Sequence, residues 1–275
     1  MMDLSKTSKD AINELRAAAE QCAKATRAAA EDAAVILRHW EDLVRSIEKD
    51  WPFHLLALVQ KESHVLKKMR SDNHPAIPAL EEAHRVAKEK ADAVLRRYPS
   101  HLEEAFRRAG LPLDSDSRHP RYRVGNKFFQ IEIDEQRRMA RLSNHEGRLA
   151  DLPADIGAVL ELVQREHKRV FDRPFDGKRF LKQLRAQYIA IIKKDKQADG
   201  ASVPIRQITR RLGKNLKGFR SDEFLVDLSR LVESQPMEID GCKLDLQQTK
   251  DTNQGMLLYG TAGRGYIGFV VFRKT

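Results

Sequence analysis

The chain has 275 residues, of which 41% are hydrophobic and 33% are charged. This length allows one large domain or two of ordinary size, and the hydrophobic content suffices for packed cores. No apolar run approaches the roughly 18 residues that a membrane-spanning helix needs, and the first residues are charged where a signal peptide would be apolar. The sequence therefore predicts a cytoplasmic protein without a membrane segment.

The two cysteines, Cys22 and Cys242, lie far apart in the sequence and outside any CxxC or Cys/His pattern. A disulfide framework or a zinc site is therefore not expected. The histidines of the first third of the chain are not spaced as an HExxH pair or another metal motif. We expect no metal and no cofactor.

The net charge of +10 is distributed unevenly along the chain. Residues 1–112 contain 19 basic and 18 acidic side chains, whereas residues 164–220 contain 17 basic and 5 acidic ones, a net charge of +12. A field concentrated in this way attracts polyanions. The basic face of residues 164–220 is therefore predicted to bind nucleic acid, and a solvated face that only maintains solubility is the alternative.

Residues 1–112 have the pattern of a helical domain. Residues 5–49 lack Gly and Pro, are rich in strong helix formers, and place apolar residues at heptad spacing. Further helices are expected at about 52–70, 78–98 and 100–109, the last of them closed by a Gly-Leu-Pro sequence. These elements predict a coiled-coil-like helical hairpin or bundle.

The first of these helices is expected to outrun the two that follow it, so part of its heptad seam needs a cover from elsewhere. A protein partner or self-association would provide it, and a self-contained bundle without a partner is the alternative. Small residues at the centre of the seam allow close helix approach, as in an antiparallel hairpin. The expected assembly residues are Ile12, Leu15, Ile36, Trp40, Leu43 and Ile47.

A polar segment that ends in proline, residues 113–120, is the predicted linker. The second domain is then residues 121–275, an α+β domain. It opens with a β-hairpin over 121–143, because Phe129, Ile131 and Ile133 alternate with polar residues. The arginines of this hairpin are almost balanced by neighbouring acids. The overall prediction is a mainly α fold with small β elements.

The C-terminal part of this domain predicts a helix at about 152–171, then helices at 178–195, 204–212 and 221–234, and finally alternating strands. The order helix, short helix, helix and β-hairpin over residues 178–275 resembles the winged-helix superfamily. The resemblance lies in the order of elements. It implies nucleic-acid binding or, as in many members, docking to another protein.

One feature departs from a DNA-reading winged helix. The helix at 221–234, which would enter the major groove, contains Asp222, Glu223, Asp227 and Glu233 against Arg230 alone. Sequence reading by this helix is therefore not expected. The predicted contacts are instead to the nucleic-acid backbone, by Lys182, Arg185, Arg206, Arg210, Arg211, Lys214, Lys217, Arg220, Lys250 and Arg264.

A helical arm combined with such a module is similar to the winged-helix accessory subunits of chromosome-organising, SMC-type ATPase complexes, to which some bacterial defence assemblies are related. The sequence thus predicts a non-catalytic subunit that binds duplex DNA or another nucleic acid. A protein–protein adaptor and a winged-helix transcription regulator are the alternatives. Only one string, Asp240–Lys250, has a loose nuclease-like pattern, and a polar strand explains it better, so no catalytic residue is predicted.

Overall fold

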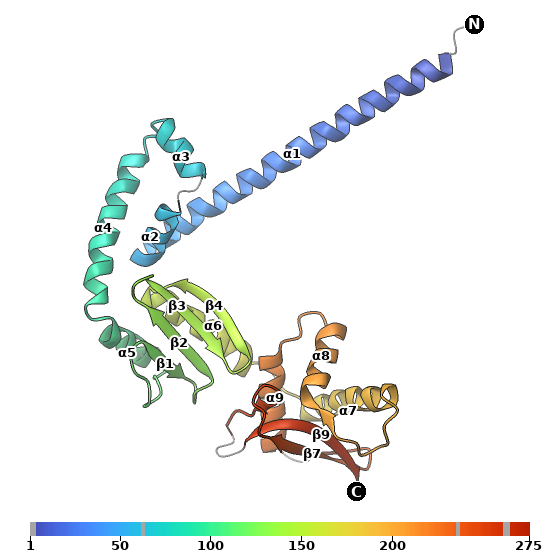
Figure 1. Ribbon diagram of the computed structural model, residues 1–275. Helices are drawn as coiled ribbons and strands as arrows, with labels where there is room; N and C mark the ends of the chain where they lie inside the picture. The colour runs from blue at the N-terminus through green and yellow to red at the C-terminus, as the bar shows by residue number, and fades with distance from the viewer. Residues whose placement is uncertain (1–3, 62–63, 235–236, 261–264) are drawn as a thin grey trace. The chain divides into compact units, whose positions relative to one another are not determined.

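The computed structural model describes residues 4–61, 64–234, 237–260 and 265–275, without the side chains of 4–12, 64, 65, 68 and 234 (Figure 1). The chain divides into two compact units, Met1–Arg96 and Arg97–Thr275. The predicted linker at 113–120 thus lies inside the second unit. The division falls earlier because helix α5 (Tyr98–Arg108) packs on helix α6 (Ile156–Phe171).

The first unit is helical. Its elements are α1 (Leu4–Glu48), α2 (Pro52–Gln60), α3 (His64–Ser71) and α4 (Ile77–Leu95). A proline opens α2 at its first helical position, where the missing N–H costs no hydrogen bond. The apolar α2 packs on both α1 and α4, whereas the sequence predicts a single helix from 52 to 70. The core of the unit includes Leu43, Phe53, Leu55, Leu56, Val59, Leu66, Ala87 and Ala91.

Only the C-terminal end of α1 belongs to this core. Leu43 is 2% exposed and Ser46 is buried, whereas every residue from 13 to 38 is exposed. Figure 1 shows α1 continuing far beyond the helices that pack on its C-terminal end. The predicted hairpin or bundle therefore exists only around this end, and the remainder of α1 is an arm without a partner among the described residues.

The second unit opens with an antiparallel sheet of order β1-β2-β3-β4. Its strands are β1 (Arg121–Val124), β2 (Phe129–Asp134), β3 (Met139–Asn144) and β4 (Gly147–Pro153). The sequence predicts the β2–β3 hairpin but assigns the end of β4 to the start of a helix. As a half-buried edge strand that ends in proline, β4 lacks the alternation that marks a strand.

The exposed face of this sheet has its charges already paired. Register aligns Arg121 with Glu132, Glu132 with Arg141, and Arg141 with Asp151. The ion pairs along this row are 3.3, 3.9 and 3.3 Å long. Cross-strand pairs of opposite charge stabilise a sheet. The balance of arginines and acids that the sequence shows is thus a direct pairing across strands.

The rest of the second unit combines helices with a second antiparallel sheet, of order β5-β9-β7-β6 with β8 on β9. Short β5 pairs with β9 through Val203 and Val270, which brings the segment between two helices onto the last strand. The elements are α7 (Gly177–Lys194), β5 (Val203–Pro204), α8 (Ile205–Asn215), α9 (Ser221–Ser234), β6 (Glu238–Ile239), β7 (Cys242–Thr249), β8 (Met256–Leu257) and β9 (Tyr266–Lys274).

An aromatic cluster joins the first sheet to this C-terminal part. Phe128, in the turn before β2, packs edge-on against Phe171 of α6 at 5.0 Å and against Tyr259 at 5.6 Å. Phe171 and Tyr259 are themselves 4.8 Å apart. Edge-to-face aromatic packing adds to the stabilisation from buried area. The sheet, α6 and the segment before β9 therefore share one core.

A buried hydrogen bond connects α5 to the segment before α6. The hydroxyl of Tyr98, a fully buried side chain, donates to the carbonyl of Ala154 at 2.7 Å. Tyr98→Phe would leave that buried carbonyl without its partner, so we expect the free energy of unfolding of the second unit to fall by about 1–3 kcal/mol.

The chain offers an optical readout and a control for this measurement. All five tyrosines lie in the second unit and both tryptophans, Trp40 and Trp51, lie in the first. Denaturant titration followed by tyrosine absorbance therefore reports on the second unit, and tryptophan fluorescence reports on the first. Tyr266→Phe, which removes a hydroxyl with no partner among the described residues, should change neither transition. Equal stability of Tyr98→Phe and wild type would contradict the assignment.

Candidate nucleic-acid interface

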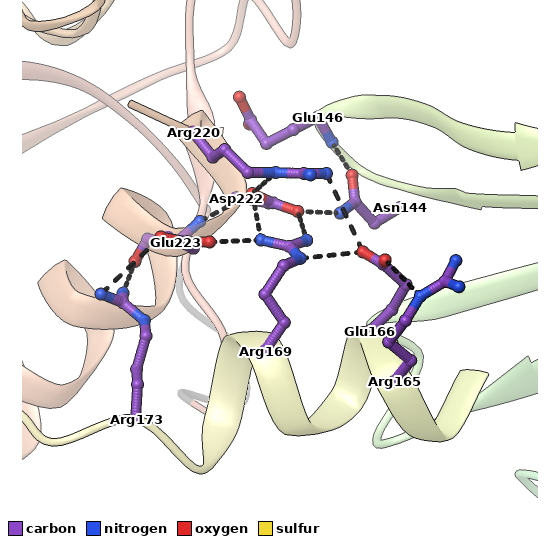
Figure 2. A network of polar contacts seen from close by, with 9 residues as sticks. All are labelled: Asn144, Glu146, Arg165, Glu166, Arg169, Arg173, Arg220, Asp222 and Glu223. Atoms are coloured by element: carbon purple, nitrogen blue, oxygen red, sulfur yellow. Dashed lines mark hydrogen bonds and ion pairs between the residues drawn. The ribbon is translucent and has the colours of Figure 1, made fainter. Parts of the chain in front are cut away.

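Helix α9 is fixed at its N-terminal end by a network of charges centred on Arg169 of α6 (Figure 2). The guanidinium of Arg169 contacts Asp222 and Glu223 at 2.5 Å each, and its Nε donates to Glu166 at 2.9 Å. Ser221 precedes these acids, and carboxylates in the first turn of a helix are favoured by the helix dipole. One arginine thus holds both acids that begin α9.

The carboxylate of Asp222 stays ionised although its side chain is almost fully buried. Burial alone would raise the pKa of Asp222, but the hydrogen bond and charge of Arg169, with the charge of Arg220, hold this pKa below its usual value. The guanidinium of Arg169 responds in the opposite sense: burial opposes its charge, yet its carboxylate partners raise its pKa. Arg169 and Asp222 therefore form a charged pair at the centre of the network.

The turn between β3 and β4 extends this network to α8. Asn144 donates to Asp222 at 3.2 Å and accepts from the backbone N–H of Glu146 at 2.9 Å. The carboxylate of Glu146 in turn accepts from Arg206 of α8 at 3.1 Å. Both the first sheet and α8 are thereby tied to the start of α9.

A second group of charges fixes the next turns of α9. Arg173 contacts Asp227 at 2.7 Å, and Arg230 donates to the carbonyls of Phe171 and Arg173 at the end of α6. Burial raises the pKa of Asp227, and the charges of Arg173 and Arg230 offset this effect only in part. Arg173, in the segment after α6, and Arg230 of α9 thus form a second contact between this region and α9.

Helix α9 is consequently exposed only in part along its described length. Its apolar residues are buried, Asp222, Glu223 and Asp227 are turned to internal arginines, and only Glu233 is exposed among its described side chains. The sequence argues against groove reading by this helix because acids repel phosphate. In the structure, three of these acids are already paired with arginines of the protein.

The adjacent helices α7 and α8 present a different surface. They pack with Gln187 accepting from Arg211 at 3.0 Å and Asp195 accepting from Gln207 at 2.9 Å. Lys214 lies three residues after Arg211, and Lys194 lies seven after Gln187, so helical spacing places each on the face of its helix that adjoins the contact. Exposed cations from two helices therefore gather along one line of contact.

The ten residues predicted to contact nucleic acid differ in availability. Five are exposed and form no hydrogen bond or ion pair with another described residue: Lys182, Arg210, Lys214, Lys217 and Lys250. Arg211 is half-buried through its bond to Gln187, and Arg220 is exposed but lies 3.5 Å from Asp222.

Two predicted residues are occupied inside the protein. Arg185 donates to the carbonyl of Ile239 at 2.7 Å, and Arg206 pairs with Glu146 and donates to the carbonyl of Gly255 at 2.8 Å. These arginines hold loops in place, so they do not belong to the exposed surface. The last predicted residue, Arg264, lies outside the described residues.

The C-terminal end of α7 adds cations that the predicted site does not contain. Lys193, Lys194 and Lys196 are all exposed and have no ion-pair partner among the described residues. Their place in the basic segment 164–220 was the available signal, and the hydrogen bond between Gln207 and Asp195 places this end of α7 beside α8. We name the α7–α8 surface as Lys182, Lys193, Lys194, Lys196, Arg210, Lys214 and Lys217.

Comparison with known proteins finds no relative of this chain. No family model matches the chain, and no curated protein or solved structure is detectably similar to it. Across the described ranges, no group of three or more His, Cys, Asp or Glu side chains is arranged to hold a metal ion. None of the helices that the structure describes is long and apolar enough to cross a membrane.

The network around Arg169 should contribute to the stability of the second unit. Asp222→Ala removes the most buried carboxylate and leaves Arg169 without a principal partner, so we expect the free energy of unfolding of the second unit to fall by about 3 kcal/mol. In a double-mutant cycle, Arg169→Ala combined with Asp222→Ala should cost less than the sum of the two single changes. Denaturant titration followed by tyrosine absorbance measures both effects.

The same titration contains its control. The tryptophan transition of the first unit should not move, and Asp151→Ala, which breaks an exposed pair on the sheet, should cost no more than about 1 kcal/mol. Additive losses for Arg169 and Asp222 would show that the two side chains do not act as one network. The lowered pKa of Asp222 further predicts that its contribution is present at neutral pH and disappears as the pH falls through that pKa.

Proposed function

We propose that this protein is a non-catalytic subunit of a larger cytoplasmic assembly and binds duplex DNA or another nucleic acid through the α7–α8 surface. The observation that carries the proposal is the contrast between paired and unpaired charge. Most cations of the first sheet, α6 and α9 are paired with acids, exposed Lys168 of α6 being an exception, whereas the seven cations of the α7–α8 surface are exposed without such partners among the described residues.

The proposal includes a winged-helix-like module from α7 to β9. Three helices followed by the β7–β9 pair form the order of elements that favours this interpretation. In such a module α9 would be the reading helix, and here its acids are paired with arginines of the protein and its first turn is bonded to α6 and to Asn144 of the first sheet. The proposed contact therefore moves to α7, α8 and the turn that follows α8.

A surface of this kind suits the nucleic-acid backbone. Most of its cations are lysines, which are flexible point charges that attract phosphate without the fixed geometry needed to read a base edge. Binding should therefore be independent of sequence and strongly dependent on salt, because each neutralised phosphate releases counterions. The arm formed by α1 would connect this module to other proteins, as in the accessory subunits of SMC-type or related defence complexes.

The test is a fluorescence-anisotropy titration with duplex DNA of random sequence, repeated over a series of salt concentrations. We expect binding at low salt that weakens steeply as salt rises. Arg210→Glu combined with Lys214→Glu should weaken binding by at least tenfold. It should also reduce the slope of log binding constant against log salt by about two, one for each lost phosphate contact.

A matched charge reversal in the first unit separates a local surface from overall charge. Lys88→Glu combined with Arg96→Glu changes two exposed cations that have no acidic partner among the described residues, and it alters the net charge by the same amount. This variant should bind almost as wild type. Equal weakening by both pairs, or no binding at low salt, would overturn the proposal.

Two other outcomes point to the alternative functions. A complex with a copurifying acidic protein, formed without nucleic acid and lost on reversal of Arg210 and Lys214, would favour an adaptor. A strong preference for one DNA sequence would favour a regulator. Cleavage of DNA with Mg²⁺ would contradict the non-catalytic assignment; Asp245, the acid of the nuclease-like string, lies 3.2 Å from Arg273 in an ion pair.

A further inference from the structure

The exposed part of α1 has an apolar stripe that its own unit leaves uncovered. Leu15, Leu37 and Ile47 are 71%, 60% and 54% exposed, and Ile36 and Val44 are also exposed. At about 100° per residue these side chains lie on one side of the helix, with Cys22 and Ala29 between them. We name this set, with the partly exposed Trp40, the arm stripe.

The predicted assembly residues overlap with this stripe only in part. Leu15, Ile36, Trp40 and Ile47 belong to it, whereas Leu43 is buried against α2 inside the unit. Ile12 lies among the residues whose side chains are not described. The helix α2 therefore covers one side of the C-terminal end of α1, and the arm stripe runs past it.

The two halves of α1 have opposite net charges, so the helix is complementary in charge to an antiparallel copy of itself. Residues 4–27 contain five basic and three acidic side chains, whereas residues 28–48 contain two basic and five acidic ones. An antiparallel pair places the positive half of each helix beside the negative half of the other. A parallel pair would place like halves together, and like charges destabilise such a pair.

The shape of the arm stripe also suits a second copy. Its centre is formed by small residues such as Cys22 and Ala29, and large side chains lie on both sides of it. In an antiparallel pair the small centres meet, and Leu15 of one copy lies near the Ile36 and Leu37 region of the other. A stripe about 50 Å long on a helix about 10 Å wide offers roughly 500 Å² per partner. The pair thus reaches the roughly 1,000 Å² in total expected of a specific interface.

We propose that the arm stripe is a homodimerisation surface on which α1 of a second copy packs antiparallel. This inference deepens the assembly role given to α1 under the proposed function, but it does not require nucleic-acid binding. The dimer would join two nucleic-acid-binding modules through one rod, so each dimer would have two basic surfaces.

The first experiment measures the mass of the full chain in solution, without nucleic acid, by light scattering at a protein concentration of about 100 μM, where even a weak dimer is populated. We expect twice the chain mass of 31.5 kDa. Ile36→Glu should give a monomer, because it buries a charge in the pair. Val35→Glu is the matched control: Val35 is 64% exposed but lies roughly 140° around the helix from Trp40. This control should remain a dimer.

The second experiment determines the direction of the two helices by distance measurement between spin labels. Cys22 is exposed near the centre of the stripe and Cys242 is buried, so a label on Cys22 reports the centre of the pair. Arg38→Cys in a Cys22→Ser chain reports the end. Antiparallel packing predicts labels within about 15 Å of each other at position 22 and about 40 Å apart at position 38. Parallel packing predicts a distance at position 38 clearly below about 40 Å, because the two residues would then lie level with each other.

Each result either supports or overturns the inference. A monomeric wild type, a dimer that survives Ile36→Glu, or a distance at position 38 clearly below about 40 Å would overturn it. These measurements are made without nucleic acid. A result that overturns the dimer would therefore not affect the proposal that the α7–α8 surface binds DNA. Conversely, loss of DNA binding in Arg210→Glu with Lys214→Glu should leave the mass of the dimer unchanged.

Discussion

The charged cluster around Arg169 is the interaction on which the rest of the second unit depends. A buried arginine is stable only when its charge is matched and its donors are used, and here Glu166, Asp222 and Glu223 provide both. The same contacts press the start of α9 onto α6 and connect it to the turn of the first sheet (Figure 2). The exposed cations of α7 and α8 lie outside this network.

The basic side chains of the second unit bear both on its stability and on its proposed function. Arginines dominate the internal pairs, as expected of a planar donor that can bind several carboxylates at once. Lysines dominate the exposed α7–α8 surface, where strong hydration and flexibility are compatible with phosphate contacts that do not select a sequence. The segment 164–220 thus contains two populations of basic side chains: one holds helices together and the other faces solvent.

The sequence predicts much of the secondary structure because long helices and alternating strands leave periodic patterns. The helix from Leu4 to Glu48, the β2–β3 hairpin and the order of helices after residue 150 follow from such patterns. Three features do not: the edge strand β4 lacks alternation, α5 joins the second unit through contacts distant in sequence, and the end of α2 at Gln60 has no strong signal in the sequence. Charge patterns likewise locate the basic segment but cannot separate Arg206, which pairs with Glu146, from exposed Arg210, because that distinction depends on a turn some 60 residues away.

The central claim is that nucleic acid contacts the α7–α8 surface. Lysine reactivity, measured by mass spectrometry after brief acetylation with and without duplex DNA, tests it most directly. The account predicts that DNA protects Lys182, Lys193, Lys194, Lys214 and Lys217, while the exposed Lys24 and Lys88 of the first unit react as before. Equal reactivity of the α7–α8 lysines with and without bound DNA, or protection confined to the first unit, would contradict it.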